Sequence, residues 1–276
     1  MKLTAATSIF RCMPSILPPG YRRLLGSFAY AVDGVGLCYA RLHDTALQYQ
    51  LPIPDAGWLE RNRLAMLVDS WSLVDHVART RKLVSRFPWQ DSNSTELNDF
   101  IRETRSATQV RNRLNQLDDD IQAEREGAED QAILGTVSWV DMRKPGGHTR
   151  YVISSGPCPQ SETPAETPIL RIPEGREVGQ FCLQVAEQEV DLDALHVTMS
   201  QFATRLDMAL TKSVHEALAD EAAKRGVSVA QLCASGPFDM TEATRFEPAA
   251  PDIVGFKIGE RYAAIEIPTD AFDHGR

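Results

Sequence analysis

The sequence predicts a predominantly helical α+β protein, with a helix bundle followed by a small antiparallel sheet and a long fourth helix. Apolar residues recur at helical spacing through long stretches before residue 122 and again after residue 192. Between about residues 133 and 190, apolar and polar residues alternate as they do in half-buried strands. No apolar run approaches 18 residues, the length needed to span a membrane, so we expect no membrane segment.

Two long helices are expected in the first ninety residues. The first covers residues 21–50, and the apolar stripe on one of its faces consists of Leu24, Phe28, Val32, Val35, Tyr39, Leu42, Ala46 and Tyr49. Two prolines within residues 51–54 end it, and Asp55 is expected to cap the second helix over residues 58–87. The buried stripe of the second helix is expected to contain Leu64, Leu67, Trp71, Val74 and Ala78.

The third helix is expected over residues 97–121, and its apolar face contains an arginine, Arg111. A rotation of about 100° per residue places Asn115 and Asp118 on the same face as Arg111. A guanidinium among buried side chains is costly unless a carboxylate or a ligand meets it. The partner of Arg111 is therefore either an acid (Asp118, Asp69 or Asp75), which would tie two helices together, or an anionic ligand.

The second half of the chain combines strands with one helix. Strands are expected over residues 133–141 and 148–154, joined by a turn at residues 143–147, and a third strand over residues 181–190. The fourth long helix covers residues 193–224, and Gly226 is its expected stop. Residues 253–258 and 262–267 are expected to form a small hairpin.

These elements suggest three consecutive regions. Residues 1–130 form the helical bundle, and residues 131–226 form the strands and the long amphipathic helix that packs on the bundle. Residues 227–276 are an irregular tail that holds the hairpin.

Composition limits the kind of protein. The net charge is −9, so a broad nucleic-acid-binding surface is not expected. Residues 1–90 hold eleven Lys and Arg against six Asp and Glu, which leaves a local basic patch possible. The five cysteines are scattered and form no CxxC pair, so neither a disulfide framework nor a metal site is expected. Reduced thiols and an N-terminus too poor for a secretory signal favour a cytoplasmic location. No nucleotide-binding or cofactor motif is present, and no cofactor is expected.

The second helix offers a few polar candidates. Asp75 and Arg79 are four residues apart and can form an ion pair along the helix. His76 could serve as a catalytic base, although packing explains it more simply. The basic helix end around Lys82 and Arg86 could contact phosphates, or could be a solvated helix terminus.

The order of these helices, together with Arg111-Asn112 near the end of the third, resembles the HEPN-like helical domains of bacterial proteins. The resemblance covers residues 20–121 and implies an antiparallel helix bundle. Many HEPN-like proteins act as ribonucleases or as partners of nucleotidyltransferases. In the ribonuclease members a histidine follows the arginine after four to six residues, whereas this chain has Gln116, Leu117 and Asp118 there. None of these is a base that titrates near neutral pH.

Three functions follow as hypotheses. The first is a non-catalytic interaction or RNA-associated module that binds through Arg111, Asn112, Asn115, Asp118, Asp75 and Arg79. The second is a metal-independent ribonuclease or toxin-like enzyme that uses Arg111 with another base. The third is a structural protein that forms homodimers or binds a protein partner, in which Arg111 only ties two helices together.

Overall fold

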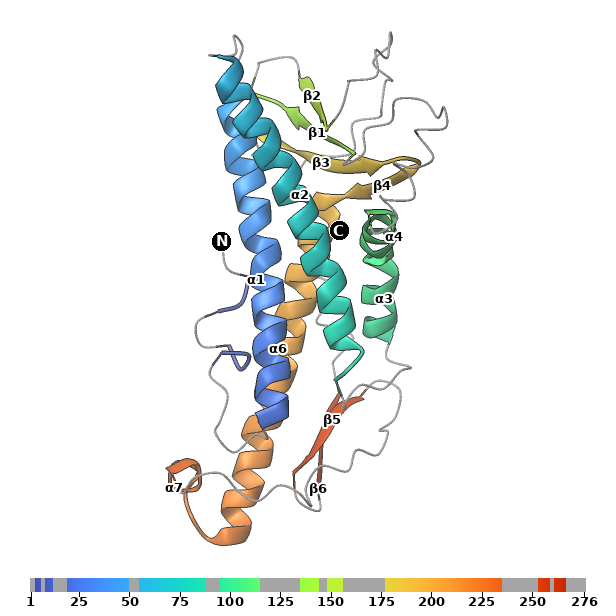
Figure 1. The fold of residues 1–276 in the computed structure, drawn as a ribbon. Coiled ribbons are helices and arrows are strands. Elements are labelled where there is room, and N and C mark those ends of the chain that lie inside the picture. Colours follow the sequence, from blue (N-terminus) through green and yellow to red (C-terminus); the bar gives the residue numbers. More distant parts are fainter. Residues whose placement is uncertain are drawn as a thin grey trace. The chain divides into compact units, whose positions relative to one another are not determined.

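The computed structural model describes residues 3–5, 8–11, 19–49, 55–87, 95–114, 135–143, 148–155, 177–234, 253–258 and 261–266. Most of these residues are helical, and two antiparallel sheets complete the fold (Figure 1). The helices are α1 (Pro19–Gln48), α2 (Ala56–Val84), α3 (Thr95–Glu103), α4 (Arg105–Leu114), α6 (Leu192–Arg225) and α7 (Val229–Ala234). The strands are β1 (Thr136–Asp141), β2 (Thr149–Ser154), β3 (Val178–Val185), β4 (Gln188–Asp191), β5 (Ile253–Ile258) and β6 (Arg261–Glu266). The predicted α+β class is confirmed.

The chain forms two compact units, each assembled from segments that are distant in the sequence. One unit contains Asp33–Arg79 and Glu103–Met199, and the other contains Leu3–Val32, Thr80–Arg102 and Ser200–Arg276. Helices α1, α2 and α6 each contribute one part to each unit. Both units therefore combine residues from the helical front of the sequence with residues from its second half.

The first two helices follow their predicted patterns except at Leu24, Leu64 and Trp71, which are not buried. Every residue of the predicted α1 stripe except Leu24 is buried. Asp55 caps α2, since its carboxylate accepts the Trp58 backbone N–H at 2.7 Å. The expectation that Leu64 is buried is wrong: it is 58% exposed, because the buried arc of α2 centres on Met66, Leu73 and Val77.

The predicted third helix is interrupted, which corrects the single helix expected over residues 97–121. Thr104, which is wholly buried, separates α3 from α4. Threonine is β-branched and a weak helix former, so it favours a break at this position. Residues 115–121 lie outside the described residues.

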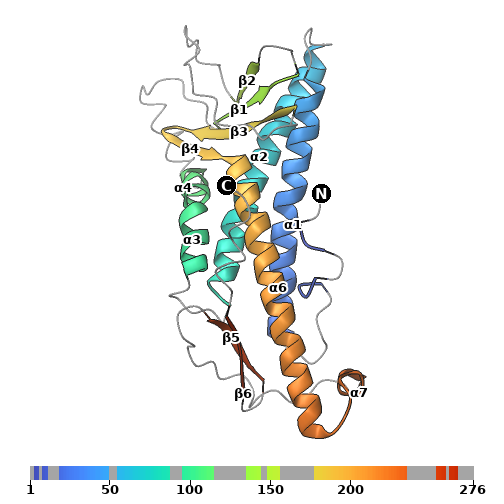
Figure 2. The same ribbon diagram turned by 180° about the vertical axis from the view of Figure 1, so that it is seen from behind.

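The larger sheet has strand order β2-β1-β3-β4 and is antiparallel throughout. One strand was expected over residues 181–190, but the structure has two, β3 and β4, joined at Ala186 and Glu187. This turn lacks the glycine or asparagine that marks tight hairpins, and Ala186 itself adopts a φ of 51°. Helix α6 begins directly after β4, as the view from behind shows (Figure 2).

The predicted end of α6 and the predicted hairpin are both present. Gly226 follows the last helical residue with a φ of 65°, the left-handed conformation that ends many helices. Strands β5 and β6 pair with each other as a separate two-stranded sheet. Within the region expected to be irregular, the short helix α7 also forms.

The second unit contains an aromatic cluster around Phe28. Its ring lies 4.7 Å from that of Phe10, 5.6 Å from that of Phe87 and 6.3 Å from that of Phe202, measured between ring centroids. Phe10 comes from the N-terminal segment, and Asp207 of α6 fixes that segment by accepting the backbone N–H of Ile9 at 2.9 Å. In the described part of the chain, no helix is long and apolar enough to cross a membrane.

Candidate functional site

Arg111 of α4 meets a carboxylate of α2. Its Nε donates to Asp75 Oδ1 at 2.7 Å, and both residues belong to the same compact unit. Asp75 is one of the three acids that the sequence offered as partners. Asp69, another of the three, instead accepts a bond from Arg41 Nε at 3.2 Å and has a side chain only 3% exposed.

Asp75 lies between two arginines. While Oδ1 accepts from Arg111, the second carboxylate oxygen, Oδ2, is 3.5 Å from Nη2 of Arg79, one turn further along α2. The ion pair that the spacing of Asp75 and Arg79 predicted is therefore present. Asp75 and Arg111 are 36 positions apart in the sequence. Together with Arg79 they form a three-residue cluster that we call the Arg-Asp-Arg site.

The Arg-Asp-Arg site is half-exposed. The exposed fractions of the side chains are 30% for Arg111, 39% for Asp75 and 55% for Arg79. The expectation that Arg111 is buried is thus only partly correct. The structure also places Asn112 on the exposed side of α4, not on its inward face. Asn115 and Asp118, the other predicted members, lie outside the described residues.

Within the described part of the chain, Arg111 uses little of its hydrogen-bonding capacity. A guanidinium carries five N–H donors, and Asp75 occupies the one on Nε. Among the described residues, the two terminal nitrogens of Arg111 meet no acceptor. Helix α4 contains Arg105, Arg111 and Arg113 but no acidic residue, so the surroundings of the site are cationic on this helix.

His76, the neighbour of Asp75, packs against α1. A Cβ placed on Gly34 would lie 2.5 Å from the Cε1 atom of the His76 ring, so only glycine leaves room for this ring. Burial, with a smaller contribution from the charge of Arg79, lowers the pKa of His76. The imidazole is therefore neutral at neutral pH and takes part in helix packing.

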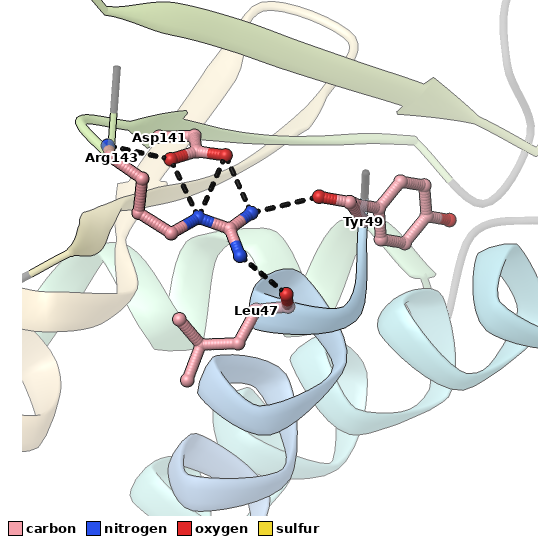
Figure 3. A network of polar contacts seen from close by, with 4 residues as sticks. All are labelled: Leu47, Tyr49, Asp141 and Arg143. Atoms are coloured by element: carbon pink, nitrogen blue, oxygen red, sulfur yellow. Dashed lines mark hydrogen bonds and ion pairs between the residues drawn. The ribbon is translucent and has the colours of Figure 1, made fainter. Parts of the chain in front are cut away.

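A different arginine of this unit, Arg143, makes hydrogen bonds to one carboxylate and two backbone carbonyls (Figure 3). Its Nε and Nη2 donate to the Asp141 carboxylate at 3.0 and 2.6 Å. Nη1 donates to the carbonyl oxygen of Leu47 at 2.7 Å, and Nη2 also donates to that of Tyr49 at 2.8 Å. These carbonyls lie at the C-terminal end of α1, where a helix leaves acceptors unsatisfied and favours a cation.

Sequence reasoning placed Arg143 in a turn and assigned it no role. Its position after β1 is a turn-like context, and its partners lie 94 and 96 residues away. No spacing in the sequence signals such a contact.

Aromatic rings surround the same helix end: the Tyr49 ring is 5.1 Å from that of Trp58, 4.9 Å from that of Trp139 and 5.8 Å from that of Tyr151. Desolvation in this cluster raises the pKa of Tyr49 to about 12.

A partly buried polar contact joins α1, β3 and α6 in the same unit. The Asp193 carboxylate accepts the Tyr39 hydroxyl and, at 2.6 Å, the backbone N–H of Phe181. The ring of His196 stacks on that of Tyr39 with centroids 4.0 Å apart. This contact ties the N-terminal turn of α6 to its neighbours.

Groups with metal-binding chemistry do not gather in the part of the chain that the structure describes. There, no three His, Cys, Asp or Glu side chains come together as a metal site would require. Cys38 and Cys182 are free thiols, and desolvation raises the pKa of Cys38 to about 11 and that of Cys182 to about 12. Both are protonated and unreactive at neutral pH.

Comparison of the chain with family models, with curated proteins and with solved structures finds no match.

Proposed function

We propose that the protein is a non-catalytic, RNA-associated module of HEPN-like type, and that its Arg-Asp-Arg site contacts phosphates. The observation that carries the proposal is the pairing of Arg111 with Asp75 through Nε alone in a half-exposed setting. RNA enters the proposal through the resemblance of residues 20–121 to HEPN-like domains. The site supplies the phosphate-binding chemistry.

The energetics of the Arg111–Asp75 pair favour binding over helix locking. Half-exposed ion pairs contribute about 0–1 kcal/mol to stability, whereas breaking a buried pair costs about 3–5 kcal/mol. The side chain of Arg111 is 30% exposed and that of Asp75 is 39% exposed, so this pair is closer to the half-exposed class. Tying helices together therefore explains little of why an arginine is held at this position.

The unused donors of Arg111 suit a phosphate. Arginine binds phosphate oxygens through two parallel N–H bonds, and its planar fork fits that geometry better than a lysine does. Asp75 fixes the guanidinium through Nε, which leaves both terminal nitrogens for such a contact. Arg79 contributes a second, more exposed guanidinium from the same cluster. The exposed residue Asn112 follows Arg111 directly in the sequence.

The residues at the positions of the family histidine support a non-catalytic role. Gln116, Leu117 and Asp118 occupy the positions where the resembled ribonucleases have their histidine. The nearest imidazole in sequence to the site is His76, and its ring packs against Gly34 on α1. Proton transfer to an RNA hydroxyl needs a base within hydrogen-bonding reach of it.

Binding and cleavage of one labelled single-stranded RNA pool test the proposal. Fluorescence anisotropy should show binding by the native protein, a clear loss of affinity for Arg111→Ala, and little change for Arg22→Ala. Arg22 is an exposed arginine of α1 without a partner among the described residues, so it controls for the loss of one positive charge. The RNA should remain intact. Equal affinities of all three proteins, or cleavage that depends on Arg111, would overturn the proposal.

A further inference from the structure

We infer that Asp75 determines which anions the Arg-Asp-Arg site accepts: it admits the spaced phosphodiesters of a nucleic-acid strand and excludes compact phosphate dianions. The inference rests on the proposed function, because it concerns the same site. It assigns a selective role to a residue that would otherwise count only as a salt-bridge partner.

The position of the carboxylate is the first argument. Asp75 gives one oxygen to each arginine, at 2.7 Å to Arg111 Nε and at 3.5 Å to Arg79 Nη2. A single compact anion that bridged both guanidiniums would need this same position. The protein's own carboxylate already fills the position between Arg111 Nε and Arg79 Nη2, so a free phosphate ion cannot bridge these two groups without displacing Asp75.

The charge of Asp75 is the second argument. Two guanidiniums alone would present two positive charges to an anion, and Asp75 reduces this local charge by one. A phosphate dianion beside the carboxylate meets a like charge, and even two single like charges repel by about 1 kcal/mol at 4 Å in a fully aqueous medium. The half-exposed setting keeps this repulsion moderate but does not remove it.

The remaining guanidinium donors of the site suit separate phosphates. The terminal nitrogens of Arg111 meet no acceptor among the described residues, and 55% of the Arg79 side chain is exposed. A strand carries one negative charge on each phosphodiester, so one phosphate can bind Arg111 and another can bind Arg79 without entering the space between them. The site thus favours distributed single charges over one concentrated double charge.

Inorganic phosphate is the probe, and Asp75→Asn is the decisive variant. Asparagine keeps an oxygen that accepts from Arg111 Nε but removes the negative charge. Asp44→Asn is the matched control, because Asp44 is an exposed acid of α1 with no partner among the described residues. The measurement is the thermal midpoint as a function of phosphate concentration, with ionic strength held constant by sodium chloride, since a ligand of the folded state raises this midpoint.

We expect Asp75→Asn to bind phosphate at least about tenfold more tightly than the native protein and the Asp44→Asn control, which corresponds to about 1.4 kcal/mol. Adding Arg111→Ala to Asp75→Asn should abolish this gain. Asp75→Ala, which removes charge and acceptor together, should keep it. Equal phosphate responses of Asp75→Asn and Asp44→Asn, or a gain that survives Arg111→Ala, would overturn the inference. A native protein that fails to bind RNA would overturn the proposed function, while the phosphate titration would still decide the role of Asp75.

Discussion

Arg143 and Asp141 form a nearly enclosed ion pair at the end of β1, with side chains 24% and 11% exposed and a shortest N–O distance of 2.6 Å. The same guanidinium donates to the carbonyl of Leu47 in the last turn of α1 and to that of Tyr49, just after the helix (Figure 3). Arg111, the arginine that stands out in the sequence, makes one hydrogen bond to Asp75, and the side chains of this pair are more exposed. The two arginines therefore differ in what their removal should do.

Arg143→Ala should lower the free energy of unfolding by about 3–5 kcal/mol, because the largely buried Asp141 carboxylate would lose the guanidinium that balances its charge. Urea denaturation of the native protein and the variant measures this loss. The double variant Arg143→Ala/Asp141→Ala should lose less than the two single variants together. A loss of less than about 1 kcal/mol for Arg143→Ala would show that the cap on α1 does not stabilise the fold.

Arg111→Ala should lower the free energy of unfolding by no more than about 1 kcal/mol, as expected for a half-exposed pair. The same urea titration checks it, and Asp75→Ala should have a similarly small effect. A loss as large as that of Arg143→Ala would mean that the pair locks α4 to α2, and the binding role would lose its main support.

Gly34→Ala should destabilise the protein through His76. The added methyl group would lie 2.5 Å from the ring, and overpacking of this kind costs about 1–3 kcal/mol. In a His76→Ala background the obstacle is gone, and alanine should then stabilise α1 by up to about 1 kcal/mol through its higher helix propensity. The measurement is urea denaturation in both backgrounds. The same loss in both would rule out the ring of His76 as the cause.

His76 should make stability depend on pH in the mildly acidic range. Burial holds its folded-state pKa below the ordinary value of 6.5, so the unfolded chain binds the proton more readily. The stability that neutral His76 contributes is complete above about pH 6.5 and declines as the pH falls through the lowered folded-state pKa. Unfolding free energies at pH 7.5 and pH 5.5 should differ less for His76→Gln than for the native protein. An unchanged difference would contradict this account.

The sequence predicted the long helices well, because periodic burial is a strong signal. All but one residue of the α1 stripe is buried, and the Asp55 cap and the Gly226 stop lie where side-chain chemistry places them. The break at Thr104 and the turn at Ala186 could not be read in this way. Neither position has a glycine or proline to mark it. The helix break depends on the burial of Thr104, and the turn depends on the backbone conformation of Ala186, and both are set by the surrounding fold.

The candidate site was predicted in part. Spacing identified Asp75 with Arg79, and helical geometry identified Arg111 as an arginine that needs a partner. Which of three acids would meet it depends on the relative placement of α2 and α4, which no local pattern determines. The role of Arg143 was missed for the same reason, since its acceptors are backbone carbonyls and carry no sequence signal.

The salt dependence of RNA affinity tests the central claim most directly. Each arginine–phosphate contact with a single strand contributes about 0.7 to the slope of log affinity against log salt concentration. For one single-stranded RNA, Arg111→Ala should therefore reduce this slope by about 0.7 relative to the native protein, while Arg22→Ala leaves it unchanged. An identical slope for the native protein and Arg111→Ala would show that Arg111 does not contact phosphate and would contradict the account.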